Sequence, residues 1–228
     1  MLQAIFHAWE RSLASATTDR VVRPFDWGVD WVDETHRRHD SAPADQLSAW
    51  VSGVMADTDA FYAIYSHPEV MRYWSFPALA DREVAANLIK KIQEDWKRRV
   101  ILKWGIALRS DNQLIGSVTL FNLDFNHRRA EIGYALGHAH WGRGYMNEAL
   151  MAVLKYAFEV LDLHRIEADV DPRNAASIKT LERLGFKREG YLRERWQVNG
   201  EIQDAFFYGL LRREWVGERK DYQIEGEQ

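Results

Sequence analysis

The sequence contains no cysteine among its 228 residues. This absence excludes disulfides, thiolate nucleophiles and thiolate metal sites, so serine, tyrosine, histidine and carboxylate side chains are left to carry any chemistry. No apolar run approaches the length needed to span a bilayer. Residues 1–11 also lack the basic region and the apolar core of a signal peptide. We therefore predict a cytoplasmic protein that does not act at a membrane.

The charge of the chain is close to balanced, with 30 basic against 34 acidic residues and a net charge of −4. This balance gives no reason to expect a nucleic-acid partner, and cationic small molecules or basic peptide ends suit it better. Hydrophobic residues make up 46% and charged residues 28%, as in ordinary globular proteins. We predict one domain over residues 1–228, with an atypical segment at 1–56, a core at 57–215 and a polar tail at 216–228.

The N-terminal part combines strand signals with a charged insertion. β-branched and aromatic residues with a proline at 20–32 predict one or two short strands. The insertion at 33–50 includes the run His-Arg-Arg-His-Asp, and it fits either a solvated loop or a lid over a substrate. Three helices are predicted after it. The first, from residue 57, and the longest, at 80–99, have aspartates as candidate caps, and a short one at 66–71 has Pro68 in its first turn.

Period-two patterns replace the helical ones in the middle of the chain. Three such segments with polar turns between them predict an antiparallel meander, and three further strands are indicated beyond it. Asn199-Gly200 between the last two is a strong hairpin signal, because both residues tolerate a positive φ. The predicted strands are residues 103–109, 114–122, 129–137, 165–170, 186–198 and 201–211.

A glycine-rich loop, Trp-Gly-Arg-Gly-Tyr-Met at 141–146, lies between a strand pattern and a periodic helix. Gly142 and Gly144 allow a tight turn that gathers several backbone N–H groups, with the positive end of the helix dipole behind them. Such a cradle suits an anion, and phosphate above all. Arg143 fits either a charge-assisted contact to that anion or a solvent-facing position. The apolar face of the helix consists of Ala149, Leu150, Val153, Leu154, Ala157, Phe158 and Leu161.

Four motifs in a fixed order give the most specific signal. They are the strand Glu131-Ile132-Gly133-Tyr134, the loop 141–146, the pair Asn174 and Ser177, and Leu184-Gly185-Phe186 at a helix end. With them, residues 129–190 resemble the cofactor-binding half of the GNAT superfamily of acyl-CoA-dependent N-acetyltransferases, in particular its RimJ/RimL-like branch. The loop departs from the general pattern at both ends, where Trp141 replaces Gln or Arg and Met146 replaces Gly or Ala.

The resemblance implies an α/β fold of the α+β type, with a mixed, mainly antiparallel sheet of about six or seven strands and helices on both faces. It also implies acetyl transfer from acetyl-CoA, without a metal, to a primary amine that is either a peptide N-terminus or a small amine. The strands at 131–136 and 165–170 should splay apart, so that pantetheine pairs along the first. The residues implied in cofactor binding are Leu136, Trp141, Gly142, Arg143, Gly144, Tyr145, Met146 and Asn174.

Two side chains are implied in the chemistry. The general GNAT pattern has a tyrosine where Leu181 stands, and the branch uses a serine three residues after the asparagine, which makes Ser177 the candidate acid for the departing thiolate. Helix-start hydrogen bonding by Ser177 and N-capping by Asn174 are simpler interpretations. Glu131 is the predicted base, acting directly or through water. It also fits ammonium binding, or a plain charge on the strand face.

Other functions are weighed against this one. A non-catalytic acyl-CoA-binding or regulatory domain would keep the cradle without the chemistry. A dinucleotide-binding oxidoreductase is disfavoured, because Asn147 replaces the third glycine of G-x-G-x-x-G and a meander precedes the loop. His138 and His140 alternate as metal ligands often do, but no third ligand stands at a recognisable spacing.

Neither the acceptor cleft nor the oligomeric state is defined by a motif. The chain has ten tryptophans, which anchor cores or line grooves. Those that could line an acceptor cleft are Trp27, Trp31 and Trp74. A homodimer is compatible with the sequence, although no segment indicates one.

Overall fold

The computed structural model describes residues 21–22, 47–49, 58–98, 100–108 and 111–215. The charged insertion up to residue 46, Trp27, Trp31 and the polar tail lie outside these residues. No helix in the part of the chain that the structure describes is long and apolar enough to cross a membrane.

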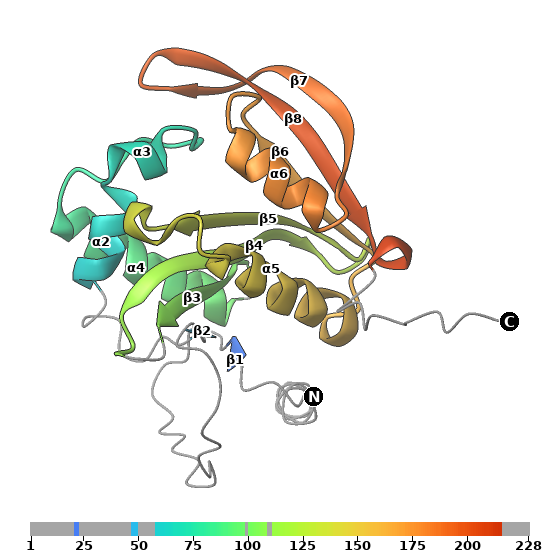
Figure 1. The fold of residues 1–228 in the computed structure, drawn as a ribbon, viewed down its shortest axis with the longest axis horizontal. Coiled ribbons are helices and arrows are strands. Elements are labelled where there is room, and N and C mark those ends of the chain that lie inside the picture. Colours follow the sequence, from blue (N-terminus) through green and yellow to red (C-terminus); the bar gives the residue numbers. More distant parts are fainter. Residues whose placement is uncertain (1–20, 23–46, 50–57, 99, 109–110, 216–228) are drawn as a thin grey trace, which may run out of the picture.

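One eight-stranded sheet forms the centre of the structure, in the order β1-β2-β3-β4-β5-β6-β8-β7 (Figure 1). Neighbouring strands are antiparallel except in the β1–β2 and β5–β6 pairs, which are parallel. The predicted mixed, mainly antiparallel sheet is thus confirmed, and two very short strands, β1 and β2, bring the number to eight. The strands are β1 (Val21–Val22), β2 (Leu47–Ala49), β3 (Leu102–Leu108), β4 (Leu114–Asp124), β5 (Arg129–Leu136), β6 (Arg165–Val170), β7 (Lys187–Val198) and β8 (Glu201–Leu211).

Helices cover both faces of the sheet, as predicted. α5 and α6 share a buried core with Ile132 of β5, whereas α2, α3 and α4 share another with Ala135 of the same strand. Residues three apart on a strand point to opposite faces, so the two cores lie on the two sides of the sheet. The helices are α2 (Thr58–Tyr65), α3 (Pro68–Met71), α4 (Arg82–Lys97), α5 (Tyr145–Lys155) and α6 (Ala175–Arg183), with the short turns η1 (His138–His140), η2 (Tyr156–Val160) and η3 (Arg212–Glu214).

Local signals determine where these elements begin and end. Asp81, a predicted cap, accepts a hydrogen bond of 2.9 Å from the Val84 N–H and starts α4. Asn199 and Gly200 join β7 to β8 with φ values of 50° and 84°, which confirms the predicted hairpin turn. The predicted helix after the glycine-rich loop is α5, which widens at its end into the π-helical turn η2 and still buries Phe158.

A buried lysine is the least expected feature of the core. Lys103 on β3 is 7% exposed, and its ammonium donates a hydrogen bond of 2.8 Å to the Tyr65 hydroxyl. The ammonium lies 4.7 Å from the ring centre of Tyr65 and 5.4 Å from that of Phe61. Removing an ammonium from water costs several kcal/mol. One charge-assisted hydrogen bond of about 1.5–3 kcal/mol and two ring contacts of about 1–2 kcal/mol each offset that cost at best.

Lys103→Met should therefore leave the free energy of unfolding unchanged or raise it by about 1 kcal/mol. Methionine keeps the apolar length of the side chain, and the Tyr65 hydroxyl keeps its 2.7 Å hydrogen bond to the Ser117 hydroxyl. Urea unfolding, with Lys90→Met at an exposed position of α4 as the control, measures the difference. A loss of more than about 2 kcal/mol would show instead that the ring contacts outweigh desolvation.

Candidate active site

The sheet opens between β5 and β6. Paired residues join these parallel strands only from Arg129 with Arg165 to Glu131 with Glu167. Beyond that point β5 stays paired with β4, and β6 stays paired with β8. One edge of residues 132–136 therefore faces β6 without a partner strand, and such an edge can bind an extended ligand as a further strand would. The predicted splay at this place is confirmed.

The glycine-rich loop follows the open end of β5 and starts α5. Gly142 has a φ of 75°, and Gly144, the N-cap of α5, has a φ of 83°. The Trp141 indole N–H donates a hydrogen bond of 2.7 Å to the Leu136 carbonyl, which fixes the loop to the strand end. Gly142, Arg143 and Gly144 are exposed. Because first-turn N–H groups of a helix have no partner within it, the loop presents a positive backbone surface next to the open edge.

The side chains around the loop have different surroundings. Tyr145 is buried in the core, so only its backbone is available to a ligand, and Met146 is half-buried against the same core. Burial, with a smaller effect of Arg143, lowers the pKa of His140 beside the loop. His138 stacks on His67 with ring centres 5.0 Å apart. Among the described residues, no three His, Cys, Asp or Glu side chains are grouped so that they could hold a metal ion.

Gly144→Val should weaken acetyl-CoA binding at least about tenfold, or roughly 1.4 kcal/mol. A Cβ built on Gly144 has no atom within 4 Å, so the valine would not clash. The effect comes instead from the φ of 83°, which a β-branched residue avoids, so the loop has to change its conformation. Titration calorimetry with acetyl-CoA measures the dissociation constant. Gly200→Val, with the same strain at a φ of 84° in the β7–β8 turn, is the matched control. An unchanged dissociation constant for Gly144→Val would show that the loop is not the phosphate site.

Tyr134 and Ser177 form a hydrogen-bonded pair beside the open edge. Tyr134 lies on the part of β5 that has no β6 partner, and its hydroxyl is 2.7 Å from Ser177 Oγ on α6. Asn174 Oδ1 accepts a hydrogen bond of 3.1 Å from the Ser177 N–H, so the N-cap interpretation of Asn174 is confirmed. Burial raises the pKa of Tyr134 to about 12, against a smaller opposite effect of the Ser177 hydrogen bond.

Sequence reasoning missed this contact of Tyr134. The residue belongs to the strand motif 131–134, and the sequence indicates no separate role for it. Tyr134 is two residues from Ile132, whose side chain packs in the core of α5 and α6. This spacing is the signal that could have placed Tyr134 on the face of α6. The serine itself was identified, and the structure places it against β5.

Glu131 lies on the opposite face of β5 from Tyr134, because the two residues are three positions apart. Its Oε1 accepts a hydrogen bond of 2.8 Å from Asn122 Nδ2 on β4. Asn122 has a φ of 50° where the β4–β5 register shifts. Among the described residues Glu131 forms no ion pair, so a neutral amide is the partner that holds its carboxylate. The Glu131 carboxylate and the Ser177 hydroxyl thus lie on opposite faces of β5, with Glu131 at the last β5–β6 pair before the open edge.

Further charged side chains of β6 lie on the face of Glu131. Glu167 accepts hydrogen bonds of 2.7 Å from Arg165 and 3.0 Å from Arg129. Asp169 Oδ2 accepts a hydrogen bond of 2.8 Å from Arg195 of β7. Asp169 Oδ1 is buried and has no hydrogen-bond partner among the described residues, so it can accept an N–H from a bound amine.

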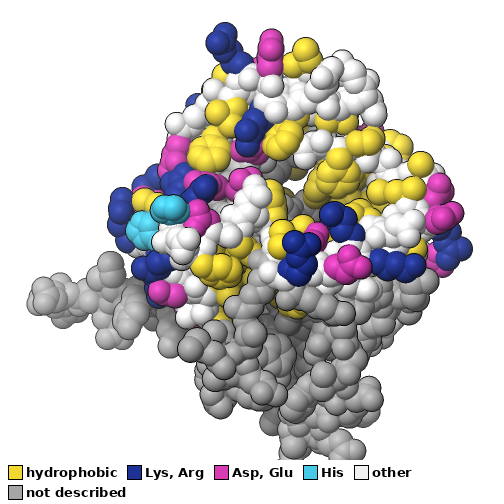
Figure 2. Space-filling model, turned by 180° about the vertical axis from the view of Figure 1, so that it is seen from behind, with side chains coloured by type: hydrophobic (Ala, Val, Ile, Leu, Met, Phe, Trp, Pro, Cys, Tyr) yellow, Lys and Arg dark blue, Asp and Glu magenta, His cyan; other side chains and the backbone are white. Residues whose placement is uncertain are grey.

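Aromatic side chains cover the neighbouring part of the sheet. Trp74 stands edge-on to Tyr65 and Phe76, with ring centres 5.6 and 5.0 Å apart, and belongs to the layer of α2 and α4. Its role in an acceptor cleft stays a prediction. The view of the molecule from behind shows hydrophobic side chains around a hollow, with charged side chains of both signs about it (Figure 2).

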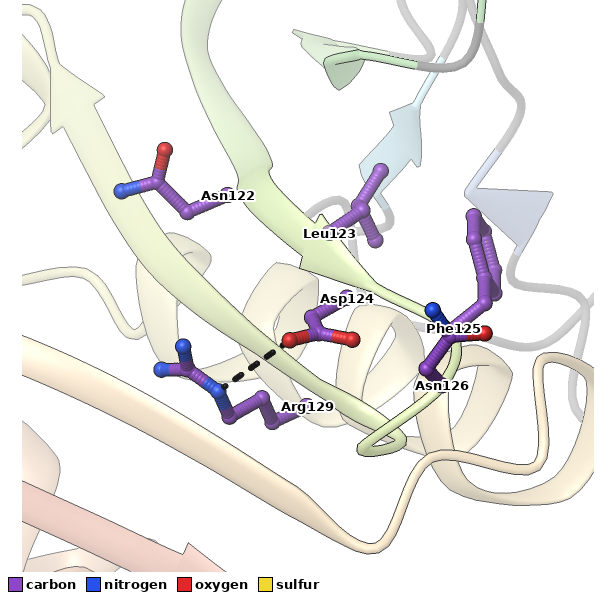
Figure 3. Close-up of a pocket in the computed structure, with 6 residues that line it drawn as sticks. All are labelled: Asn122, Leu123, Asp124, Phe125, Asn126 and Arg129. Atoms are coloured by element: carbon purple, nitrogen blue, oxygen red, sulfur yellow. Dashed lines mark ion pairs between the residues drawn. The ribbon is translucent and has the colours of Figure 1, made fainter.

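A wide depression of about 710 Å³ lies at the turn between β4 and β5 (Figure 3). It is lined by Asn122, Leu123, Asp124, Phe125, Asn126 and Arg129. Asp124 and Arg129 form an ion pair of 3.8 Å there. The turn is at the start of β5, and the glycine-rich loop is at its end, so the depression is not part of the cradle. Asn122 connects it to Glu131.

Known proteins are similar to this chain over most of its described part. Residues 53–187 match the family model for the acetyltransferase (GNAT) domain. The uncharacterized N-acetyltransferase p20 of Bacillus licheniformis is 35% identical over 163 residues, 72% of this chain and 92% of that protein. The putative ribosomal N-acetyltransferase YdaF of Bacillus subtilis is 39% identical over 149 residues, 64% of this chain and 80% of that protein.

Two further matches carry the name of a substrate or a ligand. The spermidine N(1)-acetyltransferase of Vibrio cholerae is 28% identical over 161 residues, 70% of this chain and 90% of that protein. The solved structure of Mycobacterium smegmatis RimJ in complex with CoA-disulfide has a TM-score of 0.64 and 25% identity, covering 74% of this chain and 82% of that one. The TM-score of the second supports the fold.

Proposed function

The chain belongs to the GNAT acetyltransferase family, in its RimJ/RimL-like branch, and we propose that it moves the acetyl group of acetyl-CoA directly to a primary amine. One observation carries the proposal. The open edge of β5 leads into a loop whose exposed glycines and helix start suit a pyrophosphate. A ligand with an extended amide-bearing arm and a diphosphate fits this succession, and acetyl-CoA is such a ligand.

The cofactor would lie with its pantetheine along residues 132–136 and its pyrophosphate in the loop. Main-chain N–H groups of residues 143–146 would hold the phosphate oxygens, and the exposed Arg143 adds a charge-assisted contact. Leu136 would take part through its N–H, because its carbonyl accepts the hydrogen bond of the Trp141 indole. Asn174 would contact the cofactor from the start of α6 while it caps that helix.

The two faces of the open edge suit the two proton movements of the transfer. The amine nitrogen attacks the thioester carbon, a C–N bond forms, and the C–S bond breaks with its electron pair going to sulfur. Glu131 would take the amine proton, directly or through water, because the carboxylate is free of ion pairs with the described residues. The Ser177 hydroxyl would donate a hydrogen bond to the departing sulfur from the other face. An N–H of the β5 edge would polarise the thioester carbonyl.

The acceptor is proposed as an amine of one of two kinds. The name of YdaF refers to a ribosomal substrate and that of the Vibrio protein to spermidine, so a ribosomal acceptor and a small amine each have a named relative. For either kind, the carboxylates of Glu131 and Asp169 on one face would attract the ammonium form. A homodimer also belongs to the proposal.

Calorimetry with acetyl-CoA, followed by a thiol-release screen, tests the function. The screen would use a peptide with an N-terminal alanine (the alanine-headed peptide), spermidine and a panel of other amines. A mass increase of the acceptor identifies the product. Saturable binding with thiol release is the expected result. Binding without release from any amine would favour a non-catalytic acyl-CoA-binding domain, and absence of saturable binding would refute both functions.

A further inference from the structure

We propose that Tyr134 is a positioning residue for the acetyl transfer, because its hydroxyl holds the Ser177 hydroxyl so that the serine proton is directed to the departing sulfur. The inference rests on the proposed function and adds to it a residue that acts through another. It starts from the 2.7 Å contact between the two hydroxyls, on the stretch of β5 that has no β6 partner. No other side chain is hydrogen-bonded to Ser177 Oγ within the described part of the chain.

Two arrangements of the protons fit this contact. In one, Tyr134 donates to Ser177 Oγ, and the serine proton is free for another acceptor. In the other, Ser177 donates to Tyr134, whose own proton then has the Ser177 carbonyl as a neighbour at 3.5 Å, the limit of hydrogen-bond distance. In the first arrangement Ser177 can donate to the negatively charged sulfur, and that hydrogen bond is stronger than the one from Tyr134 to the distant Ser177 carbonyl in the second. Charge developing on sulfur therefore selects the first arrangement, in which Tyr134 is the donor.

Tyr134 itself keeps its proton during this step. Its pKa of about 12 means that the phenol stays neutral throughout the working range of pH. A thiol titrates near 8.5, so moving the phenolic proton to a thiolate is disfavoured by more than about 10³-fold. Ser177 accordingly stabilises the sulfur by a hydrogen bond, and the thiolate takes its proton from solvent after it leaves. Tyr134 sets the direction of that hydrogen bond.

A second tyrosine offers a matched comparison. The Tyr208 hydroxyl on β8 donates a hydrogen bond of 3.1 Å to Glu182, so it too connects a strand to α6. Tyr208 is buried in the core like a structural residue, and its partner Glu182 lies five residues after the serine on α6. Removing either phenolic hydroxyl loses one strand-to-helix hydrogen bond. Only Tyr134 has Ser177 as its partner, so only its loss should change the chemistry.

The test compares Tyr134→Phe, Ser177→Ala, the double variant and Tyr208→Phe in the full chain. Thiol release from saturating acetyl-CoA, with the alanine-headed peptide and spermidine as probe amines, gives the turnover number, and calorimetry gives the acetyl-CoA dissociation constant. Tyr134→Phe should lower turnover about tenfold and leave the dissociation constant within about twofold. The double variant should be no slower than Ser177→Ala, because the two residues act as a unit. The tenfold loss should be equal at pH 7 and pH 9, since Tyr134 is neutral at both.

Each other outcome overturns the inference. Parent turnover in Tyr134→Phe, or losses that multiply in the double variant, would show that Tyr134 does not act through Ser177. Equal losses of turnover in Tyr134→Phe and Tyr208→Phe, together with equal falls in melting temperature, would assign a structural role only. If the parent enzyme releases no thiol with any amine, the proposed function fails and the inference fails with it. If the parent enzyme releases thiol and Tyr134→Phe does not change its turnover number, the inference fails while the proposed function stands.

Discussion

Ser177→Ala should lower the turnover number by about 10²- to 10⁴-fold while leaving acetyl-CoA affinity nearly intact. The expected loss is that of a donor to charge developing in the transition state. Ser177 Oγ lies 2.7 Å from the Tyr134 hydroxyl, beside the unpaired edge of β5 where the thioester would lie. The backbone N–H of Ser177, which Asn174 caps, is unchanged by the substitution. Pre-steady-state acetyl transfer separates this loss from any change in product release.

Thr180→Ala is the control, because Thr180 carries a hydroxyl on the same helix that donates to the Ala176 carbonyl. It should change the melting temperature slightly and the turnover number not at all. If the Ser177 hydroxyl only supports the helix start, Ser177→Ala should cost about 1 kcal/mol of stability and leave turnover within a few-fold of the parent. A thiolate is a fairly good leaving group, and water can assist it. A loss below about tenfold would therefore count against the serine without counting against acetyl transfer.

The fold could be predicted because its signals are local. Period-two segments, the Asn199-Gly200 turn and the Asp81 cap each act within a few residues, and all three reappear in the structure. The position of the splay was implied by the family resemblance rather than by any local pattern. In the structure, β6 pairs with β8 along its full length and with β5 only at its start.

The details of the site could not be predicted in the same way, because they depend on contacts between distant segments. Tyr134 and Ser177 are 43 residues apart, and their contact depends on how α6 sits against β5. Asn122 reaches Glu131 only because the β4–β5 register shifts at a left-handed residue. No sequence pattern indicates a shift of that kind. The chemical types of the residues were predictable, and their partners were not.

Glu131→Gln should lower the turnover number by about 10²-fold or more at neutral pH, if Glu131 takes the amine proton. Glutamine keeps the shape of the side chain, and its carbonyl can still accept the 2.8 Å hydrogen bond from Asn122, so the substitution removes the charge with little change of structure. Acetyl-CoA affinity should be unchanged, because the carboxylate lies on the opposite face of β5 from Tyr134 and α6. Steady-state kinetics with the amine identified by the screen provide the measurement.

Whether Glu131→Gln changes kcat or the KM for the amine decides which role Glu131 has. A base is required at saturating amine, so its loss lowers kcat, whereas a residue that only attracts the ammonium raises the KM for the amine and spares kcat. Asp169→Asn is the matched variant, because Asp169 places a carboxylate on the same face but is held by Arg195 at 2.8 Å. We expect Asp169→Asn to act mainly on KM. If Glu131→Gln behaves in the same way, with kcat close to that of the parent, then water rather than Glu131 accepts the proton.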